Sequence, residues 1–139
     1  MRENYDAVGF IPEPTVDRQY IQRGRYVLQA DERGRRVGYL LHGKPMNGSP
    51  LVISQHCIQG ESRLRGYGEA AVAEVRSRAQ RVGASCITAR CATDLPSLAF
   101  WRDQGFLLRR LVEGGRRRER VIAEIWLPLA MPLFEGSAV

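Results

Sequence analysis

The chain has 139 residues, of which 44% are hydrophobic and 26% charged, and its formal net charge is +6. This length suits one domain with its own packed core, so we expect a single domain over 1–139 with a core spanning about 25–129. No apolar run approaches the roughly 18 residues that a membrane helix needs, and the first twenty residues lack the apolar stretch of a signal peptide. We therefore expect a cytoplasmic protein that does not contact a membrane.

The first predicted elements are strands. Residues 25–30 and 37–43 flank a polar turn centred on Gly34, which predicts a hairpin. After a second turn over 44–50, residues 51–58 are mostly apolar and predict a central strand. Residues 1–24 have weak periodicity and predict no particular element.

A helix is predicted from Glu69 onward. Its apolar residues recur at spacings of three, four and three, which places them on one face, and Gly83 is a plausible end; they are Val72, Val75, Ala79 and Val82. A strand follows over 85–91, so the strand-helix-strand unit predicts that strands 51–58 and 85–91 run parallel.

The last third of the chain predicts a short helix and a hairpin. Residues 95–104 form the helix, with Asp94 as its cap and Gly105 at its end. Strands over 106–112 and 121–129 then pair across an exposed turn. The order of elements predicts an α/β fold of the α+β type, with one mixed sheet flanked by helices.

Three cysteines cannot all pair within one chain. Cys57, Cys86 and Cys91 lie in strand-like segments, so we expect buried free thiols. Neither a CxxC nor an HxxxH spacing occurs, and we expect no metal site.

The turn before the long helix carries an arginine and glycine pattern. Glycines at 66 and 68 permit a close approach and positive φ angles, and Arg63 and Arg65 add positive charge. A helix start also presents unpaired N–H groups and a partly positive dipole end. This combination favours a phosphate ligand, with diphosphate as the natural occupant. The alternative is an ordinary glycine-bracketed turn with solvated arginines.

Two motifs and their order resemble the GNAT superfamily of acetyl-CoA-dependent N-acetyltransferases. The run Arg63-Leu-Arg-Gly66-Tyr-Gly68 matches the Arg/Gln-x-x-Gly-x-Gly/Ala signature of that family. Residues 95–106 resemble its second motif, an aromatic-bearing helix that ends in Gly-Phe. The resemblance covers about residues 25–129 and implies a GNAT-like fold, in which two parallel strands splay apart and admit the pantetheine arm of acetyl-CoA.

The resemblance also implies where acetyl-CoA binds. Main-chain groups of Cys57 and Ile58 would pair with the pantetheine arm, and the Ile58 N–H would act as an oxyanion donor. Amides from Leu64 to Gly68 would hold the diphosphate beside Arg63. The complete set of implied cofactor-binding residues is Cys57, Ile58, Arg63, Leu64, Arg65, Gly66, Tyr67, Gly68, Asp94, Ser97 and Trp101.

The implied reaction is direct acetyl transfer to an amine, which must first lose a proton. Some relatives use a glutamate at the position that Val52 occupies here. Period-two alternation predicts that Val52, Ser54, His56 and Ile58 share a face, which leaves His56 as the one titratable candidate for the base. Trp101 stands where relatives often carry a tyrosine acid, and we expect it to pack in the core and against pantetheine.

The leading interpretation is an N-acetyltransferase with an unidentified amine-bearing acceptor. Residues 1–24, the 44–50 turn and the last hairpin should form the acceptor pocket, and the apolar tail after residue 130 suggests a homodimer. A non-catalytic CoA-binding or regulatory domain is an alternative, because Trp101 and Val52 depart from the family pattern. A nucleic-acid-binding module using Arg109, Arg110 and residues 116–118 is disfavoured, since no aromatic platform interleaves with these arginines.

Overall fold

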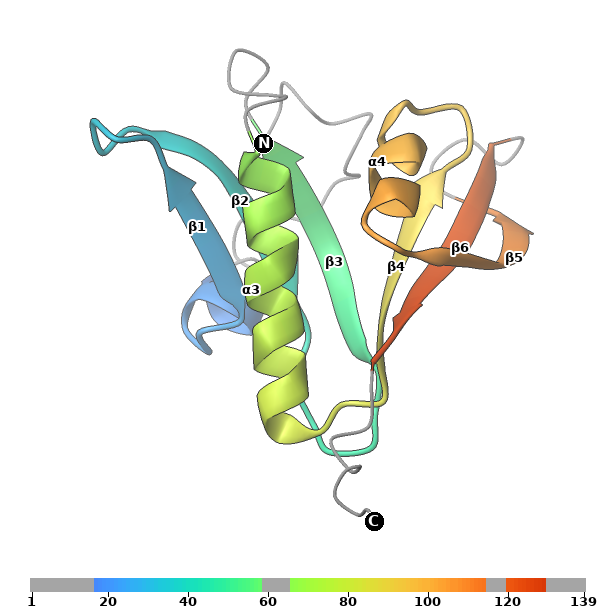
Figure 1. Ribbon diagram of the computed structural model, residues 1–139, viewed down its shortest axis with the longest axis horizontal. Coiled ribbons are helices and arrows are strands. Elements are labelled where there is room, and N and C mark those ends of the chain that lie inside the picture. Colours follow the sequence, from blue (N-terminus) through green and yellow to red (C-terminus); the bar gives the residue numbers. More distant parts are fainter. Residues whose placement is uncertain (1–16, 59–65, 115–119, 130–139) are drawn as a thin grey trace.

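The computed structural model describes residues 17–58, 66–114 and 120–129. Within these ranges, six strands form one mixed sheet in the order β1-β2-β3-β4-β6-β5, and helices α3 and α4 lie on the same side of it (Figure 1). This confirms the predicted fold class. The elements in chain order are η2, a π-helical turn over Asp17–Ile21, then β1 Tyr26–Ala30, β2 Arg36–His42, β3 Leu51–Ile58, α3 Tyr67–Val82, β4 Cys86–Ala92, α4 Ser97–Asp103, β5 Leu107–Glu113 and β6 Val121–Pro128.

The sheet consists of two antiparallel parts that meet at a short parallel contact. β1, β2 and β3 pair antiparallel, as do β4, β6 and β5. β3 and β4 pair only where Leu51 meets Ile87 and Val52 meets Thr88. Beyond Val52 the two strands diverge toward the end of the sheet where α3 begins (Figure 1). The predicted parallel pair, and the splay that the resemblance implied, are therefore confirmed.

A β-bulge at Ser54 changes which residues of β3 share a face. Leu41 pairs with Gln55 while His42 pairs with Ile53, so Ser54 is the extra residue on β3. Paired residues project from the same face of a sheet, and a bulge shifts the alternation by one residue. His56 therefore lies on the α3 face with its partner Leu40, a core residue. The predicted shared face of Val52 and His56 is wrong, because simple alternation does not allow for a bulge.

Helix α3 packs on the diverging sheet through a stripe of small and branched apolar side chains. Its buried residues are Ala71, Val72, Val75 and Ala79. Gly83 ends the helix with a φ of 77°, as predicted. Val82, the last residue of the predicted apolar face, is 38% exposed, so that face is not buried along its whole length. At the end of a helix, the last apolar residue can pass beyond the edge of the face that the sheet covers.

Arg78 of α3 joins the helix to the first two strands. Its guanidinium donates to the Tyr26 carbonyl oxygen at 2.8 Å and lies 3.1 Å from Nε2 of the buried His42. Because Nε2 faces a donor and Nδ1 lies 2.7 Å from the Gly43 carbonyl oxygen, the neutral Nδ1–H tautomer of His42 satisfies both contacts. Burial lowers the pKa of His42, which favours the same neutral form.

Helix α4 ends in a Schellman motif. The Gly105 N–H donates to the Arg102 carbonyl and the Phe106 N–H to the Trp101 carbonyl, with Gly105 at a φ of 97°. The Trp101 and Phe106 rings pack edge to face, with centroids 5.0 Å apart. This explains the Gly-Phe ending. The predicted cap is wrong, because Pro96 occupies the N-cap position and Asp94 instead pairs with Arg120 at 3.2 Å.

Candidate active site

The start of α3 lies where β3 and β4 have diverged (Figure 1). Gly66 is the N-cap residue, with a φ of 86°, and no side chain of the described residues caps the helix. A Cβ at this position would meet no atom of the described residues within 4 Å. The first N–H groups of a helix have no intrahelical acceptor, and such a start suits an anion. Arg63, Leu64 and Arg65 lie outside the described residues.

Gly68 has a different role from Gly66. It lies inside the helix, and a Cβ there would approach two ring atoms of Phe100 to 3.1 Å and His56 Cε1 to 3.5 Å. The absence of a side chain thus lets the first turn of α3 pack against α4 and β3. Of the two glycines that were predicted to permit positive φ, only Gly66 has one. Tyr67 is the first helical residue and is partly buried.

An aromatic cluster lies beside the start of α3. The His56 ring packs edge to face on Phe100 and Trp101, with centroids 5.7 and 5.5 Å away. Its buried Nε2 has no hydrogen-bond partner in the described part of the chain. Burial lowers the pKa of His56 to about 4, so the ring is neutral at pH 7. Trp101 is 6% exposed and belongs to the core, as the packing prediction stated.

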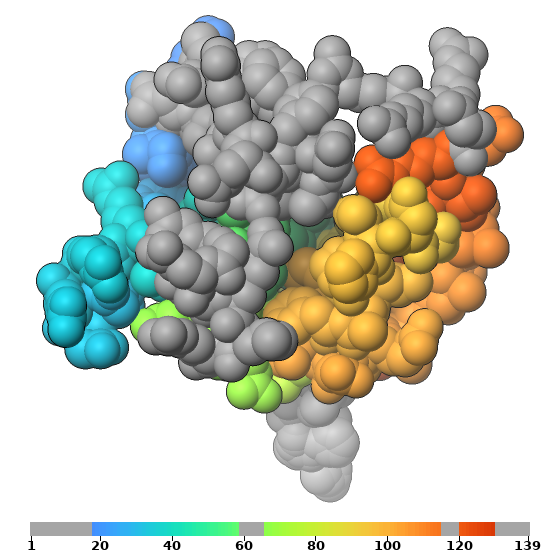
Figure 2. Space-filling view, turned by 90° about the horizontal axis from the view of Figure 1, so that it is seen from above, coloured from blue at the N-terminus to red at the C-terminus, as the bar shows by residue number. Residues whose placement is uncertain are grey.

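The structure also places four other predicted cofactor residues, Cys57, Ile58, Asp94 and Ser97. Cys57 and Ile58 end β3 and lie beyond its last pair with β4. Ser97 begins α4, with its Oγ 3.3 Å from the Cys91 Sγ. The Asp94 side chain is 63% exposed and turned to Arg120. Figure 2 looks onto this end of the molecule and shows α4 and the last hairpin on one side, with the β1–β2 hairpin on the other.

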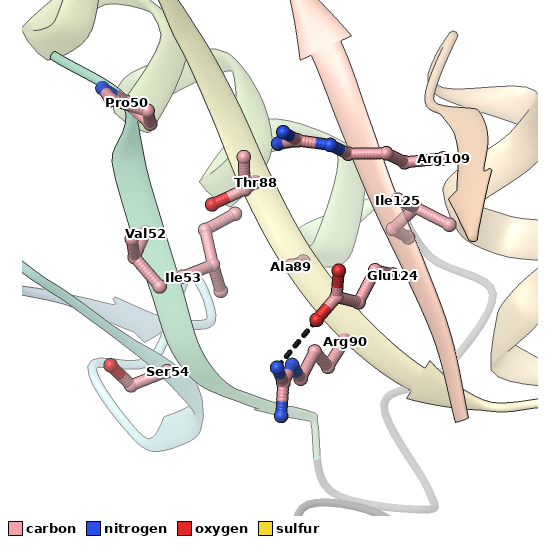
Figure 3. Close-up of a pocket in the computed structure, with 10 residues that line it drawn as sticks. All are labelled: Pro50, Val52, Ile53, Ser54, Thr88, Ala89, Arg90, Arg109, Glu124 and Ile125. Carbon is pink, nitrogen blue, oxygen red and sulfur yellow. Dashed lines mark hydrogen bonds and ion pairs between the residues drawn. The ribbon is translucent and has the colours of Figure 1, made fainter. Parts of the chain in front are cut away.

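The opposite face of the same strands contains a cavity of about 520 Å³. It lies over the short parallel contact of β3 with β4 and extends across β6 toward β5 (Figure 3). Its floor is mostly apolar and its rim carries charged side chains. The lining residues are Pro50, Val52, Ile53, Ser54, Thr88, Ala89, Arg90, Arg109, Glu124 and Ile125.

Glu124 is the acidic residue of this cavity, and sequence reasoning missed it. Its carboxylate is 15% exposed and accepts hydrogen bonds from Arg90 and Arg110. The hydrogen bond from Arg110, aided by Arg90, holds its pKa below the usual range, so Glu124 is ionised at neutral pH. One feature of the sequence could have indicated Glu124. It lies between Ala123 and Ile125, which are both buried, so strand alternation places Glu124 on the opposite face of the sheet.

Two of the three segments predicted to form the acceptor pocket contribute to the lining of this cavity, and the third contacts one of the lining residues. Pro50 comes from the 44–50 turn, and the last hairpin contributes Arg109 and Glu124. From residues 1–24, Tyr20 donates its hydroxyl to Ser54 Oγ at 2.8 Å. A cavity with an apolar floor and hydroxyl, carboxylate and guanidinium groups at its edge can bind a small polar molecule.

Three further features concern metals, membranes and thiols. The described residues contain no group of three or more His, Cys, Asp or Glu side chains that could hold a metal ion. None of the helices in the described ranges combines the length and apolarity needed to cross a membrane. Cys57, Cys86 and Cys91 are buried and form no disulfide with one another, as predicted.

Comparison with known proteins gives a family match. The profile described as the acetyltransferase (GNAT) family matches residues 2–106, more than half of the chain. A search of curated proteins found no match.

Solved structures share the fold at low sequence identity. Nourseothricin acetyltransferase superposes with a TM-score of 0.68 at 18% identity, over 76% of this chain and 65% of that one. The ribosomal-protein-S18-alanine N-acetyltransferase of Escherichia coli gives 0.74 at 14% identity, over 96% of this chain and 85% of that one. The N-acetylglutamate synthase of Neisseria gonorrhoeae, complexed with coenzyme A and N-acetyl-glutamate, gives 0.72 at 14%, over 93% of this chain and 31% of that one.

Proposed function

Because the chain belongs to the GNAT family of acetyltransferases, whose acetyl donor is acetyl-CoA, we propose that it acetylates a primary amine of an acceptor bound in the cavity. The observation that carries this proposal is the end of β3–β4 pairing at Val52. Beyond that residue no β-ladder joins the two strands, so a donor at the start of α3 and an acceptor on the cavity face can meet between them. The same opening would be closed in a continuously paired sheet.

The start of α3 would hold the diphosphate of acetyl-CoA. At Gly66 the helix starts without a side-chain cap or a close neighbour of the Cβ position among the described residues, which fits an anionic group. Arg63 and the amides of residues 64–68 would complete this site, and main-chain groups of Cys57 and Ile58 would contact the pantetheine arm. When bound, acetyl-CoA supplies an acetyl thioester, and the proposed role of the Ile58 N–H is to polarise its carbonyl. The Phe100–Trp101 pair supports this region from α4.

In the proposed reaction, the acetyl group moves from the thioester sulfur to the acceptor nitrogen in a single transfer. A C–N bond forms at the acceptor nitrogen, the C–S bond of the thioester breaks, and the proton that the nitrogen loses balances the released thiol. His56 is a poor candidate for taking that proton, because it lies on the α3 face within an aromatic cluster and its pKa is lowered to about 4. We assign proton loss instead to water in the open cavity.

A thiol-release assay tests the proposed function. The purified protein is incubated with acetyl-CoA and a panel of primary amines, and free CoA is measured with a thiol reagent while acetylated amine is detected by mass spectrometry. We expect release that depends on both protein and amine. Release without acetylated amine, or binding of acetyl-CoA without any turnover, would contradict an acetyltransferase and favour the CoA-binding alternative.

The predicted homodimer and cytoplasmic location stay predictions. The edge strand β5 exposes three leucines, Leu107, Leu108 and Leu111, each more than half accessible. Such an edge is a suitable surface for a second copy of the chain. Light scattering during gel filtration would give the mass of the particle, and a monomer at all protein concentrations would contradict the dimer.

A further inference from the structure

We propose that the acceptor carries an oxyanion, a carboxylate or a phosphate, in addition to its amine, and that Arg109 binds this group. The inference rests on the proposed function, because it assigns the cavity to the acceptor. It concerns the class of acceptor, which family membership leaves open.

A β-bulge directs Arg109 to the cavity. Leu108 pairs with Ile125 and Arg110 pairs with Glu124, so Arg109 is an extra residue on β5. Ile125 is a core residue on the helix side of the sheet, and Glu124 lies on the cavity side. The bulge thus places two successive arginines on the cavity face, where regular alternation would allow one. Bulges of this kind are found beside functional sites, where they redirect a side chain.

Arg109 differs from the neighbouring arginines because it has no partner among the residues that the structure describes. Arg90 and Arg110 both donate to the Glu124 carboxylate. Within the described residues, Arg109 has neither an ion pair nor a hydrogen bond, and its guanidinium extends over the cavity toward Thr88 (Figure 3). A guanidinium presents a planar fork of donors that matches a carboxylate or a phosphate in bidentate fashion.

The charges around the cavity favour an anionic over a polycationic acceptor. Among the described residues, the lining contains two arginines and one glutamate, and Glu124 is already shared by Arg90 and Arg110. An added cation therefore meets a positive rim, whereas an oxyanion gains from it. The amine would lie toward the hydroxyl of Ser54, a neutral polar group of the lining that accepts a hydrogen bond from Tyr20.

Matched acceptors and a charge-matched control test this inference. Amino acids are compared with their amides, which retain the amine and similar size but lose the carboxylate, and O-phosphoethanolamine is compared with ethanolamine. Spermidine represents a polycation. The enzymes are wild type, Arg109→Gln and Arg33→Gln. Arg33 is exposed in the β1–β2 turn, so its substitution removes the same charge at a distance from the cavity.

We expect wild type to prefer at least one anionic acceptor over its neutral analogue by about tenfold or more in kcat/KM, with spermidine the poorest amine. Arg109→Gln should remove that preference, and Arg33→Gln should keep it. The acceptor pair that responds identifies the oxyanion as carboxylate or phosphate. Equal use of charged and neutral amines by wild type, or a preference that survives Arg109→Gln, would overturn this inference alone. If no amine were acetylated, the proposed function would fail and the inference with it.

Discussion

At the scale of single residues, His56 shows how a local environment sets chemistry. A histidine at an exposed site would titrate near neutrality and could act as a base. Here the ring is enclosed by Phe100, Trp101 and the first turn of α3, and its buried Nε2 has no partner in the described residues. The cost of burying a charge then outweighs any gain from protonation, which explains the lowered pKa.

The lowered pKa of His56 predicts a loss of stability in mild acid. Between the unfolded value of 6.5 and the folded value of about 4, the unfolded state binds more protons, so the free energy of unfolding falls as pH falls through this window. From near pH 7 to near pH 5, His56 should account for a loss of about 2 kcal/mol. Urea unfolding of wild type and His56→Phe at both pH values measures this difference. An equal loss in both proteins would contradict the burial of a neutral His56.

The pH dependence of catalysis should show whether His56 or water takes the proton from the amine. If water in the cavity takes the proton, kcat/KM should rise with pH until it reaches the pKa of the acceptor amine, because only the free amine attacks. Changing to an acceptor amine of lower pKa should shift the profile to lower pH by the same amount. A profile that stays fixed near pH 6.5 for all acceptors, and disappears in His56→Gln, would instead identify His56 as the base.

At the scale of secondary-structure elements, α3 shows both the strength and the limit of sequence periodicity. The apolar spacing located the helix and three of its buried residues, and Gly83 marked its end. It could not show where the sheet stops covering the helix, so it included Val82 and omitted the buried Ala71. Coverage depends on tertiary packing, which a helical period does not encode.

Two matched substitutions in α3 test this description. Val75 is fully buried, so Val75→Ala should lower the free energy of unfolding by roughly 2 kcal/mol through lost burial and the remaining cavity. Val82 is 38% exposed, and Val82→Ala should change it by less than about 0.5 kcal/mol. Chemical denaturation of both variants gives the comparison. Equal effects would mean that the helix is rotated relative to the orientation described.

The two bulges explain why part of the site could not be predicted. Strands β3 and β5 were recognisable from composition, but a bulge depends on which partner residues pair across the sheet. One extra residue at Ser54 moved His56 away from the cavity face. Another at Arg109 brought an arginine to it. Residue types therefore indicated the chemistry available, whereas register determined which groups face one another.

At the scale of the whole molecule, the order of elements and the positive charge were the most informative features. The sequence of strands and helices sufficed to predict the mixed sheet and its parallel pair, whereas the splay of that pair was implied only by the family resemblance. Two segments that line the cavity, the 44–50 turn and the last hairpin, were predicted to form a pocket, but the side chains that line it were not predictable. Glu124 is one of them, since its role depends on Arg90 and Arg110 from two other strands.

The net charge of +6 predicts salt-sensitive binding of an anionic donor. Acetyl-CoA carries several negative charges, so the field of the protein should favour its association at low ionic strength. Raising the salt concentration from about 50 mM to about 500 mM shortens the Debye length well below the size of the protein. The attraction between the protein and acetyl-CoA is then screened, so the affinity for acetyl-CoA should fall several-fold. Calorimetric titrations at both salt concentrations measure the effect. Salt-independent affinity would mean that the arginines do not contribute to donor binding.

Acetyl-CoA titration by calorimetry tests most directly whether the start of α3 holds the donor. Wild type is compared with Gly66→Glu and with Gly34→Glu, a matched control in the β1–β2 turn. Both glycines have a positive φ, 86° and 80°, and no described atom lies within 4 Å of either Cβ position, so the two substitutions impose similar strain and charge. We predict that wild type and Gly34→Glu bind acetyl-CoA, while Gly66→Glu remains folded by circular dichroism and does not bind. Unchanged affinity in Gly66→Glu, or no binding by wild type at millimolar donor, would contradict the account.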